Sequence, residues 1–327
     1  GVNGEISEAN GLYKMINVKT RTSPSDMTLA DFASICTIKA QKRSFNPIWW
    51  FTGESNPGCE PLESTPDAFA KFLIATNQGC KAGNPQAKVL IEGGPWKLDA
   101  ESTGWVERYI QDTKRINPSV QFDGAAAHHY RNFPETPDLD TDIAYFLAML
   151  DRNGCSNWPF YINEGGNYCP FDIPEESISP YVVQSGNSWY MGPVSYHSGR
   201  SERIVPAFSA RNWIIGLKYQ NRVACMEDFM TPSRYTDVDF TSRFYEKVPN
   251  TLGRILGNAS FVNDIVFAPY CKGYLFRDDL TNVPIAVIWG YKEAVDRWQE
   301  DAPKYTFDFS NMNVKFIDLM ENEVQYP

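Results

Sequence analysis

The stretch Trp158-Pro-Phe-Tyr-Ile-Asn-Glu-Gly-Gly166 decides how the rest of this sequence is interpreted. Apolar residues with strand propensity run up to Glu164 and stop at two glycines. A buried strand that ends in a carboxylate and a Gly-Gly turn is typical of a parallel sheet, which presents polar side chains at the carboxyl ends of its strands. Glu164 is therefore the first candidate for chemistry. The alternative is that it is a solvated turn residue after an ordinary strand.

The same pattern recurs along the chain. A strand-like run over 47–51 is followed by Glu54, another ends at Glu92, a third ends at His128, and a fourth ends at Glu227. In all, the sequence predicts strands at about 13–18, 47–51, 88–92, 120–128, 159–163 and 222–227. Helical spacing of apolar residues separates them, at about 27–40, 65–77, 102–116, 143–150 and 205–219, and a further helix is predicted at 244–256. This alternation predicts a parallel α/β domain.

Two architectures fit the alternation: an open doubly wound sheet and a closed (β/α)8 TIM barrel. No Gly-rich phosphate-binding fingerprint follows any strand, which weakens the nucleotide-binding open sheet. Residues from several strand ends that converge at one rim favour the barrel. Because such a barrel needs eight strands and six are found, the first two βα units are expected to be missing from this chain. Either a second chain supplies them, or the chain is a fragment, or the strand count is wrong.

From Asn263 onward the sequence changes character. Strand-like runs occupy about 266–270, 273–277, 283–289, 305–309 and 314–319, with turn signals and no helix between them. Consecutive strands of this kind predict a small antiparallel sheet or sandwich. We therefore expect a barrel domain over residues 1–260 and an appended β-domain over 261–327.

The composition limits the classes of partner. A formal net charge of −10 and a pI near 4.9 argue against nucleic acid or an anionic membrane, which attract basic patches. No apolar run approaches the roughly 20 residues that span a bilayer. Aromatic residues make up 14% of the chain, a surplus that often lines sites for sugar rings, and the aromatic-rich stretch 167–203 is expected to be a lid or cleft wall.

The number and spacing of the cysteines indicate the cellular compartment in which the protein works. Seven cysteines lack CxxC spacing, so no structural zinc is expected, and a metal site from scattered histidines and carboxylates is a minor alternative. Cys59 with Cys80, and Cys155 with Cys169, are candidate disulfides of an oxidising compartment. One glycosylation sequon begins at Asn258. Together these features favour a secreted or extracytoplasmic protein.

The order of the strand-end residues resembles that of the clan-A retaining glycoside hydrolases, with no single family identified. In that clan the acid/base glutamate ends the fourth barrel strand and the nucleophile ends the seventh. The resemblance implies that Glu54, after Trp49-Trp50-Phe51-Thr52, is the acid/base and that Glu164 is the nucleophile. Residues 123–130 then form the sixth strand, with Glu92 ending the fifth and Glu227 the eighth. The C-terminal tail resembles the β-domain that many of these enzymes append, and it stops short of that domain's usual last strands.

One residue departs from the clan pattern. Gly53 stands before the implied acid/base, where the clan usually has an asparagine that binds the sugar 2-hydroxyl. Either Asn56 or a residue from another strand supplies that contact, or the substrate differs at this position, or the assignment of the acid/base is wrong.

The resemblance implies an enzyme that cleaves O-glycosidic bonds of a poly- or oligosaccharide by a retaining double displacement, without a cofactor. The substrate-binding candidates are His128, Tyr130, Asn56, Trp96, Trp189 and Glu227. Adjacent strand residues point to opposite faces, so His128 and Tyr130 are predicted to share a face and His129 to be structural.

Three alternatives stay open. Glu92, Glu227 or Asp228 replaces one member of the catalytic pair in the first. In the second, the chain is a carbohydrate-binding barrel without activity, which the Gly53 departure supports. The third is a polysaccharide lyase that uses His and Tyr as acid and base.

Overall fold

The computed structural model describes residues 15–17, 28–42, 48–50, 66–92, 98–131, 134–135, 138–165, 204–226, 244–266, 269–291, 313–318 and 322–324. The chain divides into two compact units, which are described separately. The first comprises Gly1–Tyr130, Asp140–Gly165 and Asn221–Met226, and the second comprises Arg131–Leu139, Gly166–Gln220 and Glu227–Pro327.

The first unit is built on a parallel sheet. Its strands are β1 (Met15–Asn17), β2 (Ile48–Trp50), β3 (Lys88–Glu92), β4 (Gly124–His128), β5 (Phe160–Glu164) and β6 (Val223–Met226). Within the described ranges these six strands lie in chain order, and each is parallel to its neighbours, which confirms the predicted parallel α/β domain. A doubly wound sheet reverses its strand order at a switch point, and these six strands show no reversal. The closed eight-stranded barrel stays a prediction.

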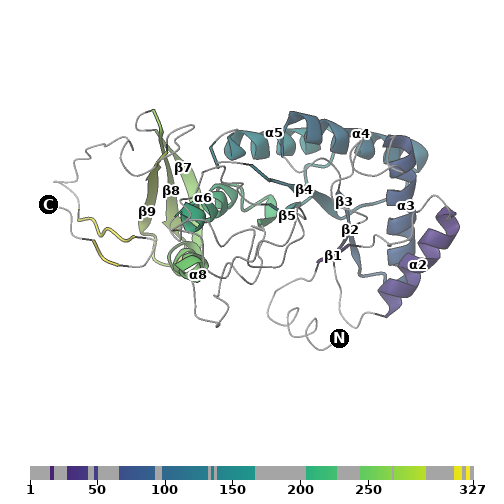
Figure 1. The fold of residues 1–327 in the computed structure, drawn as a ribbon, viewed down its shortest axis with the longest axis horizontal. Coiled ribbons are helices and arrows are strands. Elements are labelled where there is room, and N and C mark those ends of the chain that lie inside the picture. Colours follow the sequence, from purple (N-terminus) through teal and green to yellow (C-terminus); the bar gives the residue numbers. More distant parts are fainter. Residues whose placement is uncertain are drawn as a thin grey trace, which may run out of the picture. The chain divides into compact units, whose positions relative to one another are not determined.

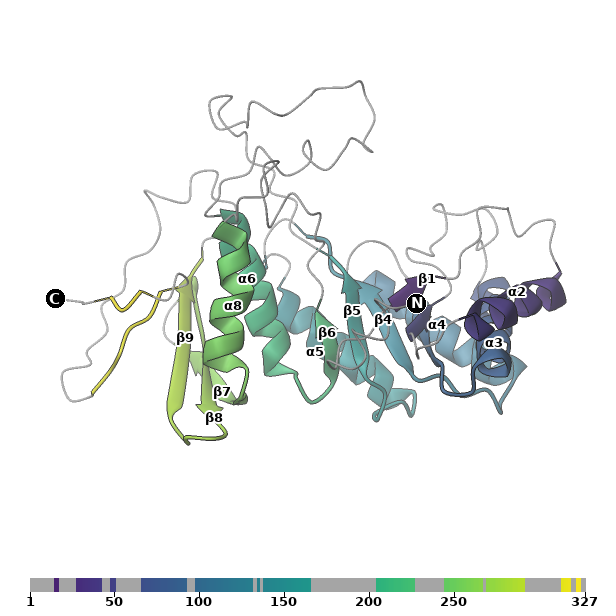
Figure 2. The ribbon, with the colours of Figure 1, turned by 90° about the horizontal axis from the view of Figure 1, so that it is seen from below.

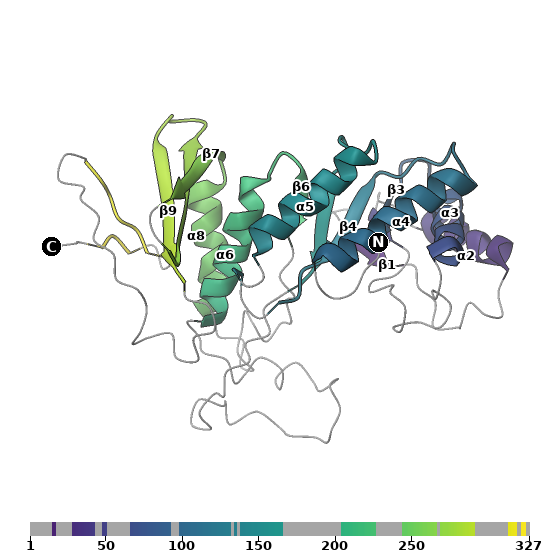
Figure 3. The same cartoon turned by 90° about the horizontal axis from the view of Figure 1, so that it is seen from above.

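Helices α2 (Leu29–Gln41), α3 (Pro66–Gly83), α4 (Ala100–Ile116) and α5 (Leu139–Arg152) belong with this sheet. Helices α4 and α5 lie on the same side of it (Figures 1 and 3). Asp99 starts α4 as its N-cap, because its side chain accepts a hydrogen bond from the Ser102 backbone N–H at 2.9 Å. Phe146 of α5 stacks on Phe160 of β5 with ring centroids 4.1 Å apart, which packs the helix against the strand.

Helices α2 and α3 pack in close contact through two glycines of α3. A Cβ at Gly79 would meet the Ala33 carbonyl oxygen, and a Cβ at Gly83 would meet that of Thr37. The buried thiol of Cys80 lies at this seam, where a hydrogen bond with Cys36 and burial raise its pKa.

The structure describes one cysteine of each candidate disulfide. Cys80 and Cys155 are both buried free thiols, while Cys59 and Cys169 lie outside the described residues. The predicted pairs Cys59–Cys80 and Cys155–Cys169 each include a residue outside the described ranges, and they stay predictions.

The second unit contains helices α6 (Ile204–Lys218) and α8 (Phe244–Leu256) and the antiparallel strands β7 (Ala259–Val266), β8 (Cys271–Asp278) and β9 (Pro284–Gly290). The two helices pack against each other and against β7 (Figure 2). The predicted strands at 273–277 and 283–289 are confirmed as β8 and β9.

The predicted strand at 266–270 is wrong. Strand β7 begins at Ala259 and ends at Val266, and the chain turns at Pro269 and Tyr270, whose φ is 62°. Proline cannot donate to a strand ladder, and a positive φ is incompatible with a strand. Of the remaining predictions, 305–309 lies outside the described residues. Within 313–318 the structure shows an isolated bridge between Ile317 and Glu323 in place of a strand.

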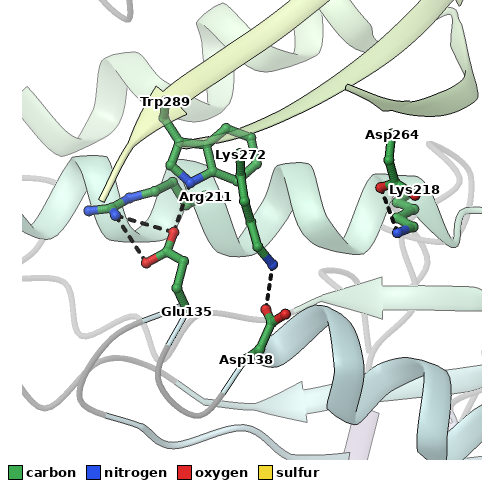
Figure 4. Close-up of polar contacts among 7 residues, drawn as sticks. All are labelled: Glu135, Asp138, Arg211, Lys218, Asp264, Lys272 and Trp289. Carbon is green, nitrogen blue, oxygen red and sulfur yellow. Dashed lines mark hydrogen bonds and ion pairs between the residues drawn. The ribbon is translucent and has the colours of Figure 1, made fainter. Parts of the chain in front are cut away.

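Polar contacts hold the segment Arg131–Leu139 within the second unit (Figure 4). Glu135 accepts hydrogen bonds from Arg211 Nη1 at 3.1 and 3.2 Å and from Trp289 Nε1 at 2.8 Å, and we call these three residues the Glu135 clamp. Asp138 pairs with Lys272 at 2.5 Å. The segment is thereby tied to α6, β8 and β9.

In the part of the chain that the structure describes, no helix is long and apolar enough to cross a bilayer.

Candidate active site

Three neighbouring strands of the parallel sheet end in polar residues. Strand β3 ends at Glu92, β4 at His128 and β5 at Glu164. The three strands are hydrogen-bonded neighbours, and their carboxyl ends lie at the same edge of the sheet because all of them are parallel. In open and closed parallel sheets alike, this edge is where binding and catalytic residues gather.

A buried polar network joins these strand ends. His128 Nε2 lies 2.9 Å from Glu92 Oε1, and Asn163 Nδ2 donates to the same oxygen at 3.1 Å. The side chains of Glu92 and His128 are 1% and 3% exposed. An ionised carboxylate can only accept hydrogen bonds, so an ionised Glu92 would place the shared proton on His128 Nε2. We call Glu92, His128 and Asn163 the strand-edge network.

A β-bulge lies beside this network. Ala127 pairs with Ile162, and the next residue of β4, His128, pairs with Glu164, so Asn163 is the extra residue of β5. Bulges are frequent at barrel rims and next to active sites, where they redirect the chain at the end of a strand. The backbone register thus makes His128 the partner of Glu164, on strands about 4.8 Å apart.

The two histidines of this segment have different surroundings. The His128 and Tyr130 rings meet edge to face with centroids 6.0 Å apart. The fully buried ring of His129 occupies the position that a Cβ of residue 165 would take, so only glycine fits directly after Glu164. Gly165, the first of the two glycines after Glu164, therefore has a packing reason.

The structure brings together only some of the predicted site residues. His128, Tyr130 and the backbone of Glu164 lie at the β3–β4–β5 edge. The other candidates lie outside the described residues: Glu54, Asn56, Trp96, Trp189, Glu227 and Asp228. Strand β6 ends at Met226, directly before Glu227.

Asn163 is a site residue that the sequence analysis did not single out. Its side chain is 6% exposed, and its Oδ1 has no hydrogen-bond partner among the described residues. The available signal was its position immediately before the strand-ending glutamate. Across the described ranges, no group of three or more His, Cys, Asp or Glu side chains is arranged to hold a metal ion.

Known proteins resemble this chain in structure. A glucosidase from Croceicoccus marinus superposes with a TM-score of 0.53 at 13% identity, over 88% of this chain and 65% of its own. AbfB, a family 51 alpha-L-arabinofuranosidase from Bifidobacterium longum, superposes with a TM-score of 0.53 at 11% identity, over 88% of this chain and 64% of its own. This chain thus spans less than two thirds of either protein.

Comparison by sequence gives no match. No protein-family model matches the sequence, and no curated protein matches it. At 11–13% identity the structural likeness shows the fold alone. Both structural neighbours are glycoside hydrolases by name, and the predicted resemblance to glycoside hydrolases is confirmed at the level of the fold, with no family distinguished.

Proposed function

We propose that this protein is a retaining glycoside hydrolase that acts on a poly- or oligosaccharide, with Glu164 as nucleophile and Glu54 as acid/base. The observation that carries the proposal is the strand-edge network beside Glu164. It consists of buried polar side chains from three strands at the carboxyl edge of the sheet, in a fold shared with a glucosidase and an arabinofuranosidase.

The proposed reaction has two steps. Glu164 attacks the anomeric carbon while Glu54 donates its proton to the departing glycosidic oxygen, which leaves a glycosyl ester on Glu164. Glu54, now ionised, removes a proton from a water molecule that attacks the same carbon and releases Glu164. Two inversions at one carbon give net retention, and each glutamate ends in its starting protonation state.

The remaining candidates have binding roles in this proposal. His128 and Tyr130 hydrogen-bond the nucleophile and the sugar hydroxyls, since both carry groups that donate or accept. Asn56 takes the 2-hydroxyl contact that Gly53 cannot make, and Glu227 binds a further hydroxyl. Trp96 and Trp189 are the surfaces on which sugar rings stack.

Hydrolysis of a panel of aryl glycosides tests the proposal. Wild-type protein is expected to turn over at least one member with retention of anomeric configuration, and Glu164→Gln and Glu54→Gln are each expected to lose about 1,000-fold or more in kcat. Glu107→Gln, which removes a carboxylate on α4 that pairs with Arg152, is the matched control and is expected to keep wild-type turnover.

Azide separates the two roles. In Glu164→Ala, azide is expected to restore turnover and give a glycosyl azide of inverted configuration, because it attacks the substrate directly. Azide in Glu54→Ala should give a product of retained configuration, because it attacks the glycosyl-enzyme. Sugar binding without turnover in the wild type would favour the inactive carbohydrate-binding barrel. Ultraviolet-absorbing unsaturated products would favour a lyase.

A further inference from the structure

Glu92 is a buried carboxylate that the proposed two-glutamate reaction does not use. It ends β3 and is 1% exposed. Burial of a carboxylate is costly unless hydrogen-bond donors compensate for the lost water. Two donors do so here, since His128 Nε2 and Asn163 Nδ2 both reach Glu92 Oε1, at 2.9 and 3.1 Å.

The burial of Glu92 excludes direct contact with a substrate and leaves a role in holding neighbouring residues. With 1% of its surface exposed, the carboxylate presents no surface to a sugar and is therefore not placed to protonate or attack a substrate. Its contacts reach two other strands instead. An ionised Glu92 accepts a hydrogen bond from the imidazole, which fixes the histidine tautomer with the proton on Nε2 and holds the plane of the ring.

Both residues that Glu92 holds adjoin Glu164. Asn163 is the residue before it in β5, and His128 is its register partner in β4, at the bulge. The Glu92 carboxylate therefore holds both the residue before Glu164 in β5 and its partner in β4. We propose that Glu92 is a positioning residue, which fixes the tautomer and orientation of His128 and the end of β5 around Glu164. The catalytic part of this inference rests on the proposed function of Glu164.

Histidine-selective NMR of the full chain tests the contact independently of activity. The chain has three histidines, His128, His129 and His197, so ring signals labelled with ¹⁵N can be assigned by single substitutions. Wild-type protein is expected to show a slowly exchanging Nε2–H for His128, assigned by its absence in His128→Asn. Glu92→Ala is expected to lose this signal, while the His129 signals stay in place. An unchanged His128 signal in Glu92→Ala would overturn the proposal.

Kinetics test whether the contact matters for turnover. Glu92→Ala is expected to lower kcat on the order of 100-fold, at the lower end of what a positioned proton-transfer group contributes, with KM changed by less than about 3-fold. Glu92→Gln keeps a carbonyl oxygen that accepts from both donors, so it is expected to recover part of the loss. Glu107→Gln serves as the control for loss of a carboxylate from the same unit.

Three further results would each decide whether Glu92 is a positioning residue. Recovery of turnover in Glu92→Ala by azide would mean that Glu92 takes part in the chemistry itself, and would overturn a positioning role. A lower melting temperature with unchanged kcat in Glu92→Ala would reduce the network to a stability element. If Glu92→Ala fails to fold, the His128 Nε2–H signal is measured in Glu92→Gln, where it is expected to shift because a neutral amide oxygen replaces the carboxylate as acceptor, and an unchanged signal there would overturn the proposal. If the wild type hydrolyses no glycoside, the proposed function fails, and the NMR signal alone then confirms or overturns the hold of Glu92 on His128.

Discussion

At the scale of single residues, the most constrained position beside the site is Gly165. The ring of His129 lies where a Cβ at this position would sit, and His129 is fully buried. Replacement of the glycine therefore has to displace a ring that is closed off from solvent. The residue that follows the proposed nucleophile is thus set by packing.

We expect Gly165→Ala to destabilise the protein by about 2 kcal/mol, because the added methyl overpacks the His129 ring. Urea unfolding measures the change. Gly104→Ala is the matched control, because a Cβ at Gly104 meets nothing within 4 Å and lies in α4. Alanine there is expected to stabilise by about 0.5–1 kcal/mol, as it does in helix interiors. Equal effects of the two substitutions would contradict the packing of His129.

The cysteines give a second prediction at this scale. Cys36, Cys80, Cys155 and Cys271 are buried free thiols. We expect all four to resist alkylation in the native protein and to be alkylated in denaturant without reductant, because burial alone protects them. Peptide mass spectrometry checks each site. A crosslinked peptide that joins Cys59 to Cys80, or Cys155 to Cys169, would show that the oxidised protein forms these disulfides.

At the scale of elements, ion pairs link neighbouring helices. Arg152 at the end of α5 donates to Glu107 of α4 at 2.6 and 2.8 Å, and Asn153 adds a third hydrogen bond at 2.7 Å. The hydrogen bonds from Arg152 are the main cause that lowers the pKa of Glu107 below its usual 4.5. A carboxyl group whose pKa is lower in the folded state stabilises the protein above its ordinary pKa.

Glu107→Gln is expected to cost up to about 1 kcal/mol at pH 7, because Arg152 is 42% exposed and the pair is screened by solvent. This contribution is lost as the pH falls through the lowered pKa of Glu107, so the difference between variant and wild type should shrink when the pH is lowered from 7 to below 4.5, the ordinary pKa of the group. Unfolding in urea at both pH values measures it. A difference that grows on acidification would contradict the assigned direction.

At the scale of the whole molecule, contacts between residues distant in sequence hold each unit together. The Glu135 clamp is the clearest case, since Glu135 lies 76 residues from Arg211 and 154 residues from Trp289. The side chain of Glu135 is 2% exposed and that of Arg211 is 15% exposed. Loss of one partner from a buried ion pair leaves the other charge uncompensated.

Glu135→Ala is expected to destabilise the protein by about 3 kcal/mol, since it leaves Arg211 and the Trp289 indole N–H without their acceptor. Glu323→Ala is the control, because it removes an ion pair with Lys315 whose side chains are 62% and 61% exposed. That substitution is expected to change the free energy of unfolding by less than about 0.5 kcal/mol. Similar melting temperatures for the two variants would count against the clamp.

Closure of the sheet into a barrel would bring the carboxyl groups of Glu54 and Glu164 close together. Glu54 follows β2 and Glu164 ends β5, and two strands lie between them in the sheet. In a flat sheet β2 and β5 would lie about 14 Å apart, whereas a retaining pair needs carboxyl groups about 5–5.5 Å apart. We expect a crystal structure with bound substrate to show the shorter separation. A distance of about 6.5–9.5 Å would indicate inversion, and a larger one would rule out this pair.

The sequence by itself determined the elements of the parallel sheet and the residues at its edge. Apolar runs with strand propensity and helical spacing between them are local signals, so the six sheet strands within the described ranges and the helices between them could be predicted. The positions of Glu92, His128 and Glu164 at strand ends followed from the same patterns, because a carboxylate or glycine marks where a buried strand stops.

Only the tertiary structure decided what these residues contact. That Glu92 is buried and bonded to His128 and Asn163 depends on strand register and on a bulge, neither of which leaves a local signature. The free state of Cys80 and the partners of Glu135 depend on helices and strands far away in the chain. Local propensity acts over a few residues, whereas burial and pairing are set by whichever distant segments pack together.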